Sequence, residues 1–404
     1  MRHLVSARSE QFTESVIREM TRLALQHEAI NLAQGFPDYD PPTAMLEAAI
    51  AAIRGGVNQY GITWGAKNLR NAIAAKVAWF PGLTIDPETE ITVTCGSTEA
   101  MIASLLAIIN PGDEVIVFEP FYENYGPDTI LSNATPRFVT LHPPDAADGD
   151  WHFDRDHLAA AFNSHTKAII LNTPNNPTGK VFTRDELTLI AELCQRWDAV
   201  AVTDEIYEHL VYDGRTHVSL ATLPGMRERT ITINAISKTY AATGWRVGWA
   251  IAPLEITAAI RKVHDFLTVG APHPLQEAAV AALGLPDSYY HEMCADYCQR
   301  REFLVPALAR AGFQCWAPRG AYYVMTDFSA VAIRNSQFAI RNDVDFARWL
   351  CAEVGIAAVP GSSFYHEPGQ GRTQIRFSFG RSLPMLEQAV ARLQRINLAT
   401  QEIT

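Results

Sequence analysis

The chain has 404 residues, of which 48% are hydrophobic and 19% are charged. This composition is typical of a protein with a large buried core and about two or three domains. Acidic residues outnumber basic ones by 44 to 33, for a formal net charge of -11, and no basic run carries interleaved aromatics. Nucleic acid and anionic membrane surfaces are therefore not expected partners.

The cysteines and the apolar segments indicate in which cellular compartment the protein is expected. The six cysteines are scattered, and the one close pair, Cys294 and Cys298, has no second pair or histidine cluster at zinc spacing. No apolar stretch reaches the ~18 residues of a membrane helix. The first ten residues lack the core of a signal peptide. We expect free thiols, no metal site and a cytoplasmic protein.

The first part of the chain predicts helices separated by irregular segments. Apolar residues at helical spacing predict a helix over Phe12–His27, with Thr13 as its cap. Two more helices are expected over Ala44–Arg54 and Lys67–Trp79. A Gly-Gly pair is expected to end the first of them and a Pro-Gly pair the second.

From Ile91 the chain alternates short apolar strands with amphipathic helices. Strands are predicted at Ile91–Thr94, Val115–Phe118, Ala168–Leu171, Val200–Thr203, Ile231–Ile236 and Val247–Ile251. Thr183 and Glu186 form a capping box, which predicts a helix that runs to about Trp197. This alternation predicts a mostly parallel sheet with helices on both faces. Ligands of such sheets bind beyond the carboxyl ends of the strands.

After about Leu285 the pattern changes to that of a smaller α+β unit. Its expected elements, ahead of a last helix, are a long helix over Ser288–Ala311, strands at Phe313–Trp316 and Tyr322–Thr326, a helix near Val344–Glu353 and a strand at Ile375–Phe379. We therefore predict an α/β protein with a large domain at residues 45–285. Residues 1–44 and 286–404 would form a small domain.

Residues suited to binding or catalysis follow the predicted strands. They are Gly96-Ser97-Thr98, Tyr122, Asn175-Asn176-Pro177-Thr178-Gly179, Asp204-Glu205-Ile206-Tyr207, Ser237-Lys238 and Arg246. Each alone has an ordinary explanation as a helix cap, a turn or the polar end of a strand. Lys238 is the least ordinary of them, because a lysine desolvated at the end of a buried strand has a lowered pKa and a nucleophilic amine.

Several of these residues suit a phosphorylated ring. Gly96, Ser97 and Thr98 offer hydroxyls and amides at a helix start, and the guanidinium of Arg246 adds a positive charge, so together they suit a phosphate dianion. The carboxylate of Asp204 can hold a ring nitrogen protonated, which keeps the ring an electron sink.

The remaining residues suit other parts of the same ring. Asn176 and Tyr207 can bond a ring oxygen, and the aromatic ring of Tyr122 can stack on the ligand. Lys238 can form a Schiff base with an aldehyde on that ring. The set as a whole predicts a site for a phosphorylated, electron-withdrawing aldehyde cofactor.

With these motifs the chain resembles a class I/II aminotransferase, of the fold-type-I family that depends on pyridoxal 5′-phosphate (PLP). The motifs that carry the resemblance, in the family's order, are Asn175-Asn176-Pro177-Thr178-Gly179, Asp204-Glu205-Ile206-Tyr207, Ser237-Lys238-Thr239-Tyr240, Thr243-Gly244-Trp245-Arg246-Val247-Gly248 and Ile375-Arg376-Phe377-Ser378. The resemblance covers nearly the whole chain. It implies a large domain with a mostly parallel seven-stranded sheet and a smaller α+β domain.

The resemblance also implies a role for each matching residue. Lys238 would bind PLP covalently and then move the substrate proton. The ring would be held by Asp204, Tyr207, Asn176 and Tyr122. The phosphate would be held by Gly96, Ser97, Thr98, Ser237, Arg246 and Tyr60. Arg376 would clamp the substrate α-carboxylate, assisted by Asn176 and the backbone at Gly35. Tyr60 would reach across from the partner subunit, which implies a homodimer.

Two positions leave alternatives open. Many members of the family carry a phosphate-binding serine three residues before the lysine, where this chain has Ala235. Either one phosphate contact is missing, or Ser237 partly replaces it. Arg376 has an ordinary alternative, as an arginine of a half-buried strand balanced by a local acid.

The substrate expectation rests on two loop segments. Gln34–Asp38 and Val359–Phe364 resemble the subgroup of kynurenine, glutamine and methionine aminotransferases, whose side-chain pocket is aromatic. Such a pocket would be lined by Phe36, Tyr60, Trp64 and Tyr122. Alternatively, Phe36 and Trp64 pack a domain interface. We expect a ping-pong reaction between a large neutral or aromatic L-amino acid, such as methionine, glutamine, kynurenine or phenylalanine, and a 2-oxo acid.

Two other functions fit the same motifs. A PLP site can catalyse β-elimination from cysteine conjugates, because removal of the α-proton is common to both reactions. A PLP-binding sensor of a transcription regulator would need a DNA-binding domain, and the roughly thirty residues before Asn31 are too few and not basic enough for one. Transamination is therefore the expected activity.

Overall fold

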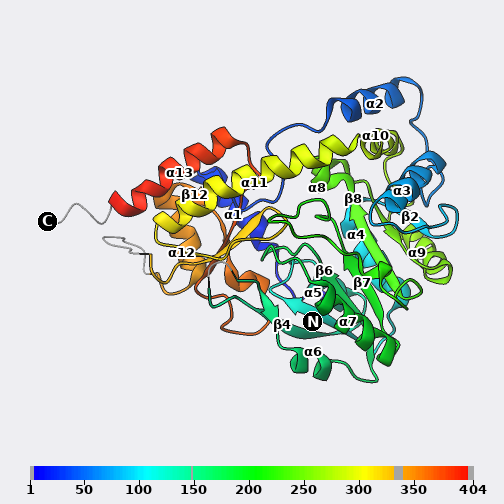
Figure 1. The fold of residues 1–404 in the computed structure, drawn as a ribbon, viewed down its shortest axis with the longest axis horizontal. Helices are drawn as coiled ribbons and strands as arrows, with labels where there is room; N and C mark the ends of the chain where they lie inside the picture. The colour runs from blue at the N-terminus through cyan, green and yellow to red at the C-terminus, as the bar shows by residue number, and fades with distance from the viewer. Residues whose placement is uncertain (1–3, 147–148, 332–339, 399–404) are drawn as a thin grey trace.

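The computed structural model describes residues 4–146, 149–331 and 340–398. A large sheet with helices on both faces stands beside a smaller sheet, as Figure 1 shows. Within the described ranges, no helix has both the length and the apolar character needed to cross a membrane.

The large sheet has eight strands in the order β2-β9-β8-β7-β6-β3-β4-β5. Their bounds are β2 (Ile91–Thr94), β3 (Glu114–Glu119), β4 (Thr135–His142), β5 (His152–Phe153), β6 (Thr166–Asn172), β7 (Val200–Asp204), β8 (Thr230–Ala235) and β9 (Gly248–Ile251). The central strands pair in parallel, whereas β9 runs antiparallel to β8 and β2, and β5 runs antiparallel to β4. The mostly parallel sheet is confirmed, and the two-residue β5 extends it beyond the expected seven strands.

Helices cover both faces of this sheet. In this part of the chain they are α2 (Thr43–Arg54), α3 (Lys67–Trp79), α4 (Gly96–Ile108), α5 (Tyr125–Leu131), α6 (Arg155–Ala161), α7 (Arg184–Trp197), α8 (Ile236–Thr239), α9 (Leu254–Leu267) and α10 (His273–Leu283). Successive residues of a strand point to opposite faces. Ile169 of β6 accordingly shares a buried cluster with Leu187 of α7, whereas Ile170 shares another with Met101 of α4.

The smaller sheet is antiparallel, with strand order β10-β11-β14-β13. Its strands are β10 (Gln314–Cys315), β11 (Tyr323–Asp327), β13 (Val359–Pro360) and β14 (Gln374–Ser378). The helices around it are α11 (Asp287–Arg310), α12 (Asp343–Trp349), which continues as one π-helical turn over Leu350–Val354, and α13 (Leu383–Leu398).

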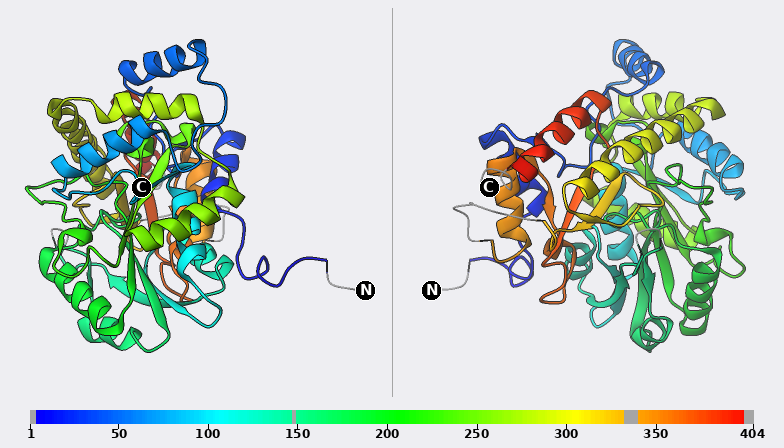
Figure 2. Two further views of the ribbon diagram at one scale, coloured as in Figure 1. Left: turned by 90° about the vertical axis from the view of Figure 1, so that its right-hand side faces the viewer. Right: turned by 60° about the vertical axis from the view of Figure 1, so that its left-hand side comes forward.

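The N-terminal segment joins this smaller unit. Strand β1 (Ile30–Asn31) pairs in parallel with β12 (Ile356–Ala357), and α1 (Val16–Gln26) packs beside β12 and β13. The stretch ahead of α1 runs away from the body of the molecule, as Figure 2 shows. The predicted domain boundaries at residues 44/45 and 285/286 stay a prediction.

The elements predicted from the sequence lie close to their observed positions, except for the start of the first helix, whereas several other elements, β4 among them, were not predicted. The capping box is confirmed, since the Thr183 side chain accepts from the Glu186 amide and Glu186 accepts from the Thr183 amide. The predicted start of the first helix at Phe12 with a Thr13 cap was wrong. Its cap is Ser15, whose hydroxyl accepts from the amide of Arg18. Strand β4 was missed because most of its residues are partly exposed, so it lacks the apolar run of a central strand.

Parallel pairing brings the strand ends to one edge of the large sheet. Asn172 at the end of β6 pairs with Asp204 at the end of β7, and Asp204 pairs with Ile233 of β8. Lys238 follows β8 on the single helical turn α8. The structure therefore places the predicted lysine and carboxylate on neighbouring strands.

One glycine of the loop after β6 packs closely against the smaller unit. Gly179 has a φ of +72°, and a Cβ there would lie 2.2 Å from Cβ of Pro318 and 2.9 Å from the carbonyl oxygen of Gly320. The Gly179 carbonyl accepts from the amides of Arg319 and Gly320 at 2.9 and 2.8 Å. Only glycine allows both the conformation and this close approach.

We predict that Gly179→Ala lowers the melting temperature by several degrees. A left-handed alanine costs about 1–2 kcal/mol by itself, and the steric clash adds to that cost. Gly82→Ala is the matched control, because Gly82 also has a positive φ, +95°, but nothing lies within 4 Å of its missing Cβ. Equal melting temperatures for the two variants in differential scanning calorimetry would contradict the packing argument.

Candidate active site

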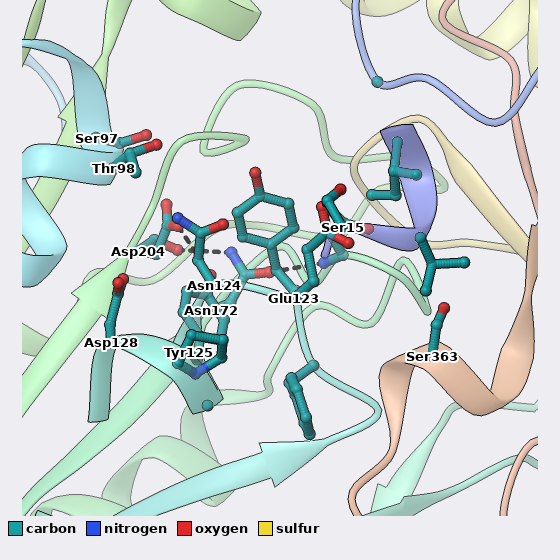
Figure 3. A pocket seen from close by; sticks show the side chains of 18 of the residues that line it. Ser15, Ser97, Thr98, Glu123, Asn124, Tyr125, Asp128, Asn172, Asp204 and Ser363 are labelled. Carbon is teal, nitrogen blue, oxygen red and sulfur yellow. Dashed lines mark hydrogen bonds between the residues drawn. The ribbon is translucent and has the colours of Figure 1, made fainter. Parts of the chain in front are cut away.

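A cavity of about 770 Å³ opens at the carboxyl ends of β6, β7 and β8. The predicted site residues that line it are Gly35, Ser97, Thr98, Tyr122, Asn176, Asp204, Tyr207, Ser237, Lys238, Arg246 and Arg376. Figure 3 shows Ser97, Thr98 and Asp204 on one side of the cavity, and Ser15 and Ser363 on the other. Residues from both sheets therefore meet in one place.

Lys238 is one of the residues that line the cavity. Its ammonium donates to the carbonyl of Gly35 at 2.7 Å. The side chain is partly open to the cavity but far from bulk solvent, and burial lowers the pKa of its amine. No carboxylate among the described residues forms an ion pair with Lys238, and the charges of Tyr323 and Asp204 only partly oppose the effect of burial. A neutral amine is the form that acts as a nucleophile or a base.

Asp204 is a buried carboxyl group with two protein donors. Tyr125 donates to its Oδ2 at 2.8 Å, and the amide of Ile206 donates to its Oδ1 at 3.2 Å. Burial raises the pKa of Asp204 to about 6, although both hydrogen bonds oppose that effect. A cationic N–H at this position would favour the ionised form of the carboxylate.

Polar donors gather at the start of α4. Arg246 lies across this helix end, donating from Nη1 to the Thr243 carbonyl at 2.9 Å and from Nη2 to the Cys95 carbonyl at 3.3 Å. Gly96 lies against Arg246 instead of lining the cavity, since a Cβ at Gly96 would be 2.3 Å from Nη2. The hydroxyl of Ser237 is buried and has no hydrogen-bond partner in the part of the chain that the structure describes. These donors suit an anion at the helix start.

Arg376 is fully buried in the middle of the smaller sheet. Its Nη1 donates to Oδ1 of Asn176 at 2.9 Å, and its Nη2 donates to the carbonyl of Ala33. No carboxylate of the described residues lies within 4.0 Å of the guanidinium, so the alternative of a local balancing acid was wrong. Nor does its Nε have a hydrogen-bond partner among these residues. The guanidinium can therefore still bind an anion from outside the chain.

Several residues that complete the site were not predicted from the sequence. Tyr207 contacts the hydroxyl of Tyr323 at 3.1 Å, and Tyr322 donates to the Gly35 carbonyl at 2.7 Å. Tyr322 and Tyr323 lie in an apolar segment that is typical of a protein core. No local sequence signal therefore distinguishes them from packing residues. Asn172 accepts from the amide of Asn176 at 2.7 Å. Its position at a strand end was a usable signal.

Besides Gly96, two predicted residues lie outside the cavity. Tyr60 is 87% exposed and borders a separate hollow beside His273. Trp64 packs under the guanidinium of Arg261, 5.0 Å from the ring centre. Four aromatic residues were predicted to line the pocket for the substrate side chain. Of these, only Phe36 and Tyr122 line the cavity in this single chain.

The family model for aminotransferase class I and II matches residues 27–393. The chain belongs to the class I and II aminotransferases. Kynurenine–oxoglutarate transaminase 1 of Homo sapiens is 37% identical over 398 residues, which cover 93% of this chain and 94% of that protein. Methionine aminotransferase of Escherichia coli strain K12 is 36% identical over 388 residues, with coverages of 96% and 97%.

A solved structure agrees with this assignment. N-succinyldiaminopimelate aminotransferase of Mycobacterium tuberculosis superposes with a TM-score of 0.92 at 38% identity, covering 97% of this chain and 100% of that one. The protein is thus an aminotransferase with the fold of its family, near the kynurenine and methionine transaminases. Class I and II aminotransferases depend on PLP. Identities of 36 to 38% do not fix the substrate.

We predict that Asp204→Asn stabilises the cofactor-free aminotransferase above pH 6. The folded pKa of about 6 exceeds the ordinary 3.8, so ionising Asp204 weakens the fold as the pH rises from 4 through 6. A difference of about 2 pH units corresponds to roughly 3 kcal/mol. Urea unfolding between pH 4 and pH 8 should show a gain over wild type that grows to pH 6 and then stays constant.

Asp213→Asn is the control variant, because it should change the free energy of unfolding in the opposite direction. Arg301 and Arg319 bond Asp213 and lower the pKa of its carboxyl to about 2. Its carboxylate therefore stabilises the fold above pH 4, and that contribution is lost as the pH falls toward 2. Parallel pH profiles for the two variants would show that burial does not set the pKa of Asp204.

Proposed function

We propose that this aminotransferase transfers the amino group of a large neutral or aromatic L-amino acid to a 2-oxo acid, with PLP bound in the cavity. The observation that best supports this proposal is the buried guanidinium of Arg376, which has no carboxylate partner within the described ranges and opens into the same cavity as Lys238. An α-amino acid brings a carboxylate and an amine at a short, fixed separation. One site with a free guanidinium and a free amine suits that pair of groups.

The residues present fit the cofactor. Ser97, Thr98, Ser237 and Arg246 would hold its phosphate, and the unpartnered hydroxyl of Ser237 is one donor open to it. The ring would be held by Asp204, Tyr207, Asn176 and Tyr122, and Lys238 would bind it covalently. When bound, PLP supplies an electron sink for the negative charge left on the α-carbon of the substrate.

The protein's own groups would orient the substrate and move its proton. Arg376 would hold the α-carboxylate in bidentate fashion, while Asn176 keeps the guanidinium in place through the 2.9 Å hydrogen bond. The amine of Lys238, whose pKa is lowered by burial, would take the α-proton and later return one. Asp204 would keep a ring N–H charged, which explains why a carboxylate is retained at a buried position.

The donor class rests on what surrounds the rest of the cavity. Phe36 and Tyr122 offer aromatic surface to a substrate side chain. Three arginines line the cavity. Arg246 already bonds the helix start, and Arg376 would take the α-carboxylate. Only Arg18 of the three is left to bind a side-chain carboxylate, and its side chain is exposed on α1. An exposed, hydrated guanidinium discriminates weakly. A large neutral or aromatic donor therefore fits better than aspartate.

A homodimer and a cytoplasmic location belong to the same proposal. Tyr60 is exposed on a surface away from its own cavity. A second copy of the chain would place that tyrosine where family members use it, at the phosphate. All six cysteines are free thiols, which suits a reducing compartment.

We predict that Lys238→Ala abolishes transamination. The variant keeps the clamp at Arg376 but loses the amine that moves the proton, and losing the general base costs at least about 100-fold in rate. Turnover should be measured as 2-oxo acid formed from the amino donor. Lys67→Ala, at a lysine whose side chain is 72% exposed on α3, should retain full activity. Wild-type turnover in Lys238→Ala would disprove the assignment of the lysine.

A spectroscopic donor panel tests the function as a whole. The protein with PLP should show a visible absorption band, and large neutral or aromatic L-amino acids should bleach it faster than aspartate. Addition of a 2-oxo acid should restore the band, as a ping-pong reaction requires. A strict preference for aspartate would contradict the donor class, and release of pyruvate and ammonia from cysteine conjugates without amino transfer would favour the β-lyase instead.

A further inference from the structure

A carboxylate stands at the mouth of the cavity. Glu123 follows Tyr122 in the loop after β3, and both residues line the cavity. The hydroxyl of Ser15 donates to Oε1 of Glu123 at 2.5 Å, which ties the start of α1 to this loop across 108 residues of sequence. Figure 3 shows the two side chains next to each other at the cavity wall.

Glu123 has acceptor capacity left over. A carboxylate has two oxygens with about four acceptor positions, and the Ser15 hydroxyl occupies one of them. No lysine, arginine or histidine of the described part of the chain forms an ion pair with Glu123 within 4.0 Å. Its side chain is half-buried, so a ligand that fills the cavity would remove more of its hydration.

Glu123 and Arg376 belong to the same cavity. Burial lowers the pKa of Arg376, while Tyr323, Tyr207 and Glu123 act in the opposite direction, so the Glu123 carboxylate is close enough for its charge to act on the guanidinium. An amino acid whose α-carboxylate binds Arg376 would extend its side chain toward the aromatic ring of Tyr122 and the neighbouring carboxylate.

We propose that Glu123 selects donors whose side chains end in an N–H group. A side-chain amide, an aromatic amine or an ammonium can donate to its open oxygen, whereas an apolar end leaves that oxygen desolvated and unpaired, and a carboxylate end is repelled. This inference rests on the proposed function and divides its donor class. Glutamine and aromatic amines would be preferred to methionine and phenylalanine.

The other charged groups of the cavity mouth bear on this selection. Glu14 is paired with Arg22 at 2.8 Å and faces solvent. Arg18 lines the cavity from the first turn of α1. If Arg18, instead of Glu123, binds the end of the substrate side chain, donors that end in a carboxylate would be preferred. The two residues thus make opposite predictions for glutamate.

The experiment compares glutamine, methionine and glutamate, which have similar lengths but different side-chain ends. We expect kcat/KM for glutamine to exceed that for methionine in the wild-type enzyme with a common 2-oxo acid acceptor. Glu123→Leu, which removes the acceptor, should lower the glutamine-to-methionine ratio by about tenfold or more, because a hydrogen bond to a charged group is lost. Glu123→Gln, which removes only the charge, should raise kcat/KM for glutamate.

Controls separate a failed inference from a failed function. Glu19→Gln changes an acid of α1 that pairs with Arg348 on the surface, and it should leave all three values unchanged. The isosteric Glu123→Gln keeps the fold even if Glu123→Leu does not, so its glutamate response alone can decide the inference. Absence of turnover with every donor in the wild-type enzyme would reject the proposed function. Turnover with a glutamine-to-methionine ratio that Glu123→Leu and Glu123→Gln leave unchanged, or with glutamate preferred by the wild type, would overturn only the role of Glu123.

Discussion

The unpaired guanidinium of Arg376 is the constraint on which the rest of the site depends. A buried charge is costly unless hydrogen bonds and neighbouring dipoles replace its hydration. The protein replaces part of that hydration with the oxygen of Asn176 and the carbonyl of Ala33. The rings of Tyr323 and Phe364 lie 4.3 and 4.9 Å from the guanidinium and add cation–π attraction. What is left unsatisfied faces the cavity and gives it affinity for a carboxylate.

This one side chain also joins three separate parts of the chain. Arg376 belongs to the smaller sheet, Asn176 to the loop after β6 of the large sheet, and Ala33 to the N-terminal segment. Both hydrogen bonds of the guanidinium form only when all three parts are in place. The close approach of Gly179 to Pro318 holds the same loop against the smaller unit. Substrate binding and the docking of the two sheets are therefore coupled through common residues.

The segment after β7 shows how the large sheet orients its part of the site. Asp204 and Tyr207 face the cavity, while Glu205 and Glu208 point to the opposite side. Glu205 accepts from Ser219 at 2.9 Å and contacts His217 at 2.8 Å. Glu208 is bound by Lys76 and Asn234. These buried hydrogen bonds fix the segment after β7 on the side away from the cavity. The side chains of Asp204 and Tyr207, which face the ligand, therefore have little freedom to rotate.

Much of the fold and most of the site were predictable from local patterns. The apolar period of each strand and helix is a property of neighbouring residues, and parallel pairing then places the carboxyl ends of the central strands on one edge. Residues with distinctive chemistry at those ends, such as Lys238 and Asp204, could be named before any contact was known. The helix start at Ser15 and strand β4 were mistaken or missed, because a cap is decided by which hydroxyl meets which amide, and β4 is partly exposed.

Only the tertiary structure decided the contacts that give those residues their properties. Tyr125 meets Asp204 across 79 residues, Ser15 meets Glu123 across 108, and Tyr207 meets Tyr323 across 116. No spacing in the sequence encodes such pairs, since they arise when separate elements pack together. The same holds for the lack, among the described residues, of an acid within 4.0 Å of Arg376, and for the position of Tyr60 outside its own cavity. The sequence by itself determined which chemical groups are available, and packing decided which of them are buried, paired or left free to act.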